Sequence, residues 1–133
     1  MDKESAMKIA KEVIDSNDIA LVSSMSIERY PNIRALKKMN NDGFKIFYFS
    51  TRAKSNKVKQ MKSHKKGCIY FFDKEKYIGV MLDGKFKIEP NTSVGISDIY
   101  KIDPVDPYDF CTIKFIVRNV QVYNNFETII FKA

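Results

Sequence analysis

Hydroxyl-bearing and basic side chains are concentrated directly after the apolar run Phe47 to Phe49. The chemically useful residues of this segment are, in order, Ser50, Thr51, Ser55, Asn56 and Lys57. The last three begin a stretch with helical spacing, and the first turn of a helix offers free backbone N–H groups and a partial positive charge. This arrangement predicts an anion site of the kind that binds phosphate. A hydroxyl helix cap followed by solvated lysines is the alternative, and the local sequence leaves it open.

The positive charge of the chain is local. The net charge is +7, from 23 Lys and Arg against 16 Asp and Glu. Seven of the basic residues lie in one stretch that contains no acid: Arg52, Lys54, Lys57, Lys59, Lys62, Lys65 and Lys66. In the remainder of the chain, basic and acidic residues are equal in number. This distribution indicates one anionic ligand or one basic face rather than a general nucleic-acid coat.

Other reactive side chains are few. The single histidine, His64, lies among lysines near a predicted helix end, where we expect an exposed residue rather than a catalytic base. Cys68 and Cys111 are far apart and have no Cys-x-x-Cys partner, so we interpret both as small core residues. The sequence predicts neither a disulfide framework nor a metal site.

The elements that would position the anion site are mostly strands. Apolar residues at helical spacing predict one helix over Ala6 to Ile14 and a short second one after Asn56 that ends near Lys66-Gly67. Alternating apolar residues predict strands at Ile19–Met25, Ile33–Met39, Phe44–Ser50, Cys68–Phe72, Tyr77–Glu89, Cys111–Tyr123 and Ile129–Phe131. A further short helix is expected over Val94 to Tyr100.

Three local signals refine this picture. Asn40-Asn41-Asp42-Gly43 is typical of a hairpin turn. Gly84 indicates a bend or a close backbone approach, and a change of parity in the last long strand predicts a bulge near Arg118-Asn119. We therefore expect one domain over residues 1–133 that is mainly β with short helices and folds as an antiparallel barrel.

The order of elements resembles the pyridoxamine 5′-phosphate oxidase-like FMN-binding split-barrel family. The resemblance rests on a strand ending in Ser50-Thr51, a helix start at Ser55-Asn56-Lys57, and Arg34-Ala35-Leu36-Lys37 on the preceding strand. It implies an antiparallel split β-barrel, FMN as cofactor, and a homodimer with the flavin at the interface. The cofactor-binding residues that it implies are Arg34, Ala35, Leu36, Lys37, Ser50, Thr51, Ser55, Asn56 and Lys57. A deazaflavin or heme replaces FMN in some relatives.

Two departures from the family pattern bear on function. Asn56 stands where many relatives have arginine, so we expect a less positive phosphate shell and weaker FMN binding. The sequence printed here ends at Ala133, without the C-terminal Arg and His of the true oxidase, so we do not expect vitamin B6 oxidation. The chain looks more like the short general-stress and nitroreductase-like members.

Three functional hypotheses follow. The first is an FMN-dependent oxidoreductase, with substrate and electron donor unidentified, in which the flavin performs the electron transfer. The second is a non-catalytic protein that stores or senses a flavin or another phosphate-bearing ligand. The third is a nucleic-acid-binding barrel, which the basic segment suggests and the apolar context of the aromatic residues disfavours. A charged N-terminus and no long apolar run predict a cytoplasmic protein without a membrane segment.

Overall fold

Strands dominate the computed structural model, which describes residues 1–90 and 109–133. The described elements are α1 (Lys3–Asp15), β1 (Ile19–Met25), β2 (Pro31–Asp42), β3 (Ile46–Arg52), α2 (Asn56–Ser63), β4 (Lys66–Asp73), β5 (Ile78–Pro90), β6 (Phe110–Asn124) and β7 (Glu127–Lys132). Each predicted strand is present within a few residues of its expected bounds. The helix expected over Val94 to Tyr100 lies outside the described residues.

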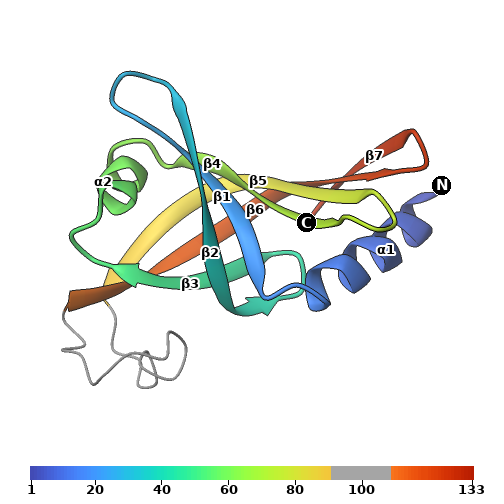
Figure 1. Ribbon diagram of the computed structural model, residues 1–133, viewed down its shortest axis with the longest axis horizontal. Helices are drawn as coiled ribbons and strands as arrows, with labels where there is room; N and C mark the ends of the chain where they lie inside the picture. The colour runs from blue at the N-terminus through green and yellow to red at the C-terminus, as the bar shows by residue number, and fades with distance from the viewer. Residues whose placement is uncertain (91–108) are drawn as a thin grey trace.

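All strand pairings are antiparallel, in the order β3-β2-β1-β4-β5-β6-β7. An additional pairing of β3 with β6 closes six of the strands into a barrel, and β7 extends the sheet from the far half of β6. The two helices lie toward opposite ends of the barrel (Figure 1). This architecture confirms the expected antiparallel split barrel. No helix within the described residues is both long and apolar enough to cross a membrane.

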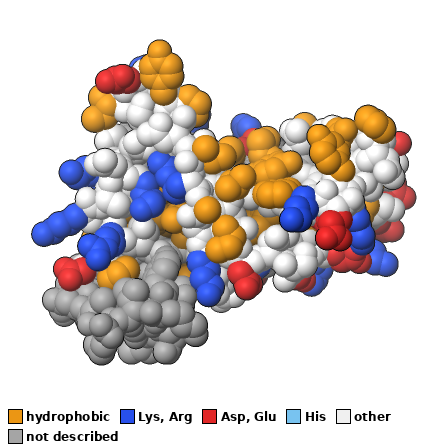
Figure 2. Space-filling view, viewed as in Figure 1, with side chains coloured by type: hydrophobic (Ala, Val, Ile, Leu, Met, Phe, Trp, Pro, Cys, Tyr) orange, Lys and Arg blue, Asp and Glu red, His pale blue; other side chains and the backbone are white. Residues whose placement is uncertain are grey.

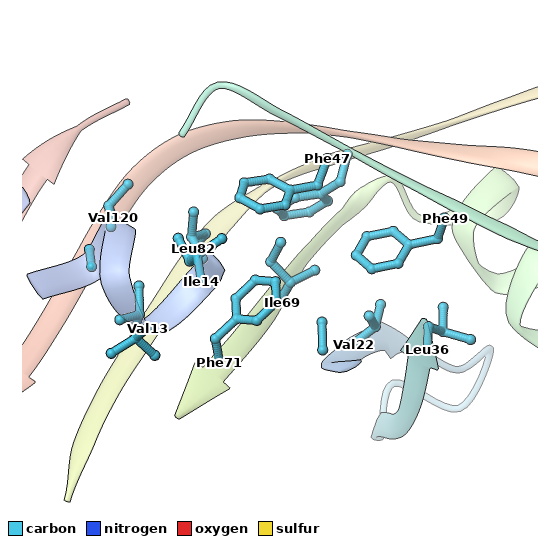
Figure 3. Close-up of a cluster of buried hydrophobic side chains, with 14 of the residues drawn as sticks. Val13, Ile14, Val22, Leu36, Phe47, Phe49, Ile69, Phe71, Leu82 and Val120 are labelled. Atoms are coloured by element: carbon cyan, nitrogen blue, oxygen red, sulfur yellow. The ribbon is translucent and has the colours of Figure 1, made fainter. Parts of the chain in front are cut away.

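Aromatic side chains fill the barrel interior. Five phenylalanines on four different strands have at most 2% of their surface exposed: Phe47, Phe49, Phe71, Phe86 and Phe115. Residues of α1, including Val13 and Ile14, close one end of this cluster (Figure 3). Burying side chains of this size stabilises the fold by roughly 1.5–3 kcal/mol each relative to exposure. The interior is therefore a packed core and not a ligand channel.

A bulge in β6 confirms the predicted change of parity. Asp83 pairs with Asn119 and Gly84 pairs with Val117, so Arg118 has no partner in the ladder. Its guanidinium instead donates two hydrogen bonds to the Asp83 carboxylate, at 3.0 and 2.9 Å. These bonds lower the pKa of Asp83. The extra residue bends β6 between its first half, which pairs with β3, and its second half, which pairs with β7.

Two expectations need correction. The second helix ends at Ser63 rather than near Lys66-Gly67, because those two residues pair with β5 as the start of β4. Cys111 is buried as expected, but Cys68 is only half-buried. Cys68 alternates with the inward-facing Ile69, so its side chain lies on the outer face of the sheet.

Gly84 provides a test of the barrel geometry. A Cβ at this position would lie well inside van der Waals contact of the Ile116 carbonyl oxygen. We expect Gly84→Ala to lower the free energy of unfolding, measured with urea, by on the order of 1–3 kcal/mol because the strands must move apart. Gly43→Asn is the control: Gly43 has φ +53° and open space around it, and asparagine tolerates that conformation. Equal urea midpoints for Gly84→Ala and the unmodified protein would contradict the close approach.

Candidate anion site

Arg34 of β2 points inward, on the same side of the strand as the core residue Leu36. Its guanidinium donates to Ser24 Oγ at 2.7 Å, to Gln60 Oε1 at 3.2 Å and to the Val22 carbonyl at 3.3 Å. Ser24 in turn donates to Gln60 Oε1 at 2.7 Å. Every one of these partners is neutral. The contacts thus fix the direction of the guanidinium without balancing its charge.

Lys57, in the first turn of α2, supplies a second cation at the same end of the barrel. Its Nζ donates to Thr51 Oγ1 at 3.0 Å. Burial lowers the pKa of Lys57, and the positive charge of Arg34 lowers it further. Burial also lowers the pKa of Arg34. Within residues 1–90 and 109–133, neither cation has a carboxylate partner. Two partly desolvated positive charges without a counter-ion favour a bound anion.

The start of α2 adds neutral donors to this pair of cations. Ser55 is the N-cap residue in extended conformation, yet its side chain makes no capping hydrogen bond. Its Oγ is buried and has no hydrogen-bond partner in the part of the chain that the structure describes. The N–H groups of the first helical turn lie beside it and also attract negative charge. A buried hydroxyl without a partner is costly, so it points to a ligand oxygen as its partner.

The predicted residues divide into three groups. Arg34, Thr51 and Lys57 converge, with Ser50 buried next to Thr51. Ser55 and Asn56 form the helix start, and the Asn56 side chain is exposed. The third group, Ala35, Leu36 and Lys37, does not join the other two. The Leu36 side chain belongs to the core, and Ala35 and Lys37 occupy the face of β2 opposite to Arg34.

The inward lysine of β2 is Lys38 rather than Lys37. Lys38 Nζ donates to the Ile14 carbonyl of α1 at 3.2 Å and lies 5.7 Å from the centre of the Phe71 ring. These contacts place Lys38 at the α1 end of the barrel. It therefore serves the packing of α1 and not the anion site.

Two residues of the site were missed from the sequence: Ser24 and Gln60. A polar residue at an inward position of β1, after the buried Ala20 and Val22, is a signal that could have identified Ser24. Gln60 follows Lys57 by three residues and so shares its side of α2. Together they form the neutral cradle that orients Arg34.

His64 is exposed at the end of α2, as expected. It lines a cavity of about 470 Å³ with Arg29, Gln60 and residues of the β1–β2 hairpin. Within the described residues, no group of three or more His, Cys, Asp and Glu side chains is placed to hold a metal ion.

Comparison with known proteins agrees with this fold. Residues 7–95 match the protein-family model described as Pyridoxamine 5'-phosphate oxidase. The fold is similar to a Clostridium acetobutylicum protein related to general stress protein 26 of B. subtilis, with 28% identity and a TM-score of 0.85 over 98% of this chain and 96% of that one. No curated protein sequence matches the chain.

Two more distant structures share the fold. One is a pyridoxamine 5'-phosphate oxidase-related, FMN-binding protein from Nostoc punctiforme, with 10% identity and a TM-score of 0.65 over 98% of this chain and 94% of that one. The other is an F420 reductase, with 15% identity and a TM-score of 0.68 over 80% of this chain and 91% of that one. The chain belongs to the pyridoxamine 5′-phosphate oxidase-like family of FMN-binding split barrels.

Proposed function

We propose that this protein binds FMN through its phosphate at the Arg34–Lys57 site and acts as a flavin-dependent oxidoreductase. The observation that carries the proposal is the pair of partly buried cations held by neutral partners at a helix start. A phosphate dianion would supply the missing negative charge, and guanidinium and ammonium groups bind it with charge-assisted hydrogen bonds. Family membership makes FMN the first choice among phosphate-bearing ligands.

The residues present fit a phosphate group. Thr51 holds the Lys57 ammonium in place, and Ser55 offers a buried hydroxyl that has no other partner among the described residues. Asn56 offers an amide where many relatives have a charge, so this shell has fewer full charges than theirs. The amide still donates hydrogen bonds to phosphate oxygens. The chain thus retains the phosphate-binding chemistry with lower electrostatic strength.

When bound, the flavin supplies the electron transfer. The chain's own contribution is to hold the phosphate end and to orient the cofactor, which requires no catalytic acid or base. A non-catalytic flavin store or sensor would use the same contacts. Bleaching of the bound flavin by a reduced nicotinamide cofactor supports the enzyme, and no bleaching by either reduced nicotinamide cofactor supports the store. Two free thiols fit the cytoplasm as the compartment.

A second copy of the chain is the proposed partner. Apolar residues share the outer face of the sheet across β2, β1, β4, β5 and β7: Ile33, Ala35, Ile19, Leu21, Tyr70, Phe72, Met81 and Ile130. Figure 2 shows hydrophobic side chains gathered in the middle of this face of the molecule. Exposed apolar patches of this kind are typical of protein interfaces. A homodimer built on this face would cover them.

The dimer proposal predicts that Phe72→Glu produces a monomer in sedimentation experiments. Phe72 is 46% exposed and stacks on Tyr70 at 6.1 Å between ring centres, so a carboxylate there would place a charge inside the interface. Phe126→Glu is the matched control, because Phe126 is 94% exposed in the β6–β7 turn outside this face. A monomeric unmodified protein, or dissociation by both variants alike, would refute the assignment.

The phosphate contact predicts different effects of Lys57→Ala on two related ligands. FMN affinity should fall roughly tenfold or more, because one charge-assisted hydrogen bond is worth on the order of 1.5–3 kcal/mol. Riboflavin has the same ring without the phosphate, so its affinity should change little. Lys59→Ala is the control, since Lys59 is exposed two residues further along α2. Fluorescence titration gives all the affinities, and an equal loss for riboflavin and FMN would remove the phosphate role of Lys57.

A further inference from the structure

A basic groove lies on the outer surface of the barrel, beyond the C-terminal half of α2. It consists of two adjoining cavities of about 400 and 610 Å³ that share Lys85 and Ile116 as lining residues. The first lies between α2 and β5, and its floor is apolar: Met61, Phe86, Ile88 and Ile116. The second continues across β4, β5 and β6 as far as Arg118. These volumes are in the range of small-molecule sites.

The rim of this basic groove is almost entirely cationic. Lys62 and Lys65 border it from the α2 side, and Lys66, Lys85, Lys87 and Arg118 border it from the sheet. In the part of the chain that the structure describes, the one acidic lining residue is Asp83, whose carboxylate is already bonded to Arg118. Within the described residues, the only carboxylate within salt-bridge distance of any of these lysines is Glu89, 3.9 Å from Lys87.

Strand register places like charges directly opposite each other in this region. Lys66 pairs with Lys85 across β4 and β5, and Lys87 pairs with Lys114 across β5 and β6. Like charges at such positions repel and destabilise a sheet. Outside the groove, by contrast, Lys11 pairs with Asp15. Two repulsive pairs beside a cavity therefore call for an external anion.

We propose that this basic groove is a second ligand site, which takes a small molecule with several negative charges and an apolar or aromatic body, of the nucleotide class. The lysines of both rims would contact a di- or triphosphate, and the apolar floor would accept the rest of the molecule. The residues that line this groove do not include Arg34 or Lys57. The inference does not depend on the flavin proposal.

The lining residues favour a small ligand over a single-stranded nucleic acid. Proteins that bind such strands stack successive bases on exposed aromatic rings. Among the described residues, the only aromatic one that lines the groove is Phe86, which is 2% exposed. The large exposed apolar residue of the groove is Ile116, at 44%. A surface of this kind suits one compact body with clustered phosphates.

Titration calorimetry with ATP at low salt tests the proposal. The unmodified protein should bind ATP, and Lys85→Glu should weaken binding roughly tenfold or more, because it removes one charge-assisted contact and adds a repulsion. Lys76→Glu is the control, because it makes the same change in net charge in the β4–β5 turn. Lys76 lies roughly 30 Å from Lys85 along the extended chain, at about 3.3 Å per residue. Its effect should stay within about twofold, because such distant charges are screened.

Thermal unfolding separates loss of binding from loss of folding. Lys85→Glu places an acid opposite Lys66, so Tm should be equal to or higher than that of the unmodified protein. A lower Tm would contradict the like-charge argument. No ATP binding at millimolar concentration, or equal losses in both variants, would overturn the site. Two further results would also overturn it: loss of ATP binding in Lys57→Ala alone, or binding of a single-stranded oligonucleotide that is much tighter than that of ATP and is abolished by Lys85→Glu.

Discussion

The structure depends on β6, because this strand closes the barrel. It pairs with β5 along most of its length, with β3 through residues 110–116, and with β7 through residues 119–124. The extra residue Arg118 separates the last two partners, and closure leaves few strand edges exposed. Because β3 is held against β6 up to Arg52, and Ala53 N–H bonds to the Asp109 carbonyl at 2.9 Å, α2 must start at the barrel end. Closure therefore positions Lys57 near Arg34.

Charge is distributed unevenly between scaffold and sites. In the scaffold, opposite charges neutralise each other, as where the Arg118 guanidinium donates two hydrogen bonds to the Asp83 carboxylate. At the barrel end, Arg34 and Lys57 are partly desolvated and receive only neutral hydrogen bonds, although even partial burial of a charge is unfavourable. Those hydrogen bonds offset part of the unfavourable free energy of desolvation, and a bound anion would offset more of it. The same reasoning applies to the basic groove, where solvent already screens the lysines and the expected affinity is lower.

Local patterns predicted most of the fold and about half of the site. Alternation predicted the strands, the parity change predicted the bulge at Arg118, and the hydroxyl-rich segment before α2 predicted Thr51 and Lys57 as site residues. Local patterns could not show which side chains from different elements meet in space. Ser24, Arg34 and Gln60 come from three elements far apart in sequence, and only barrel closure brings them together. The early end of α2 at Ser63 likewise depends on pairing with a strand that follows later.

The function proposed for the cation pair at the barrel end is to hold a flavin phosphate. Its most direct test is to purify the protein, denature it and identify the released cofactor by absorption and mass spectrometry. We expect FMN at a stoichiometry approaching one per chain, or full loading after FMN is added and excess ligand removed. Release of heme or a deazaflavin, or a chain that stays free of flavin after incubation with FMN, would contradict it.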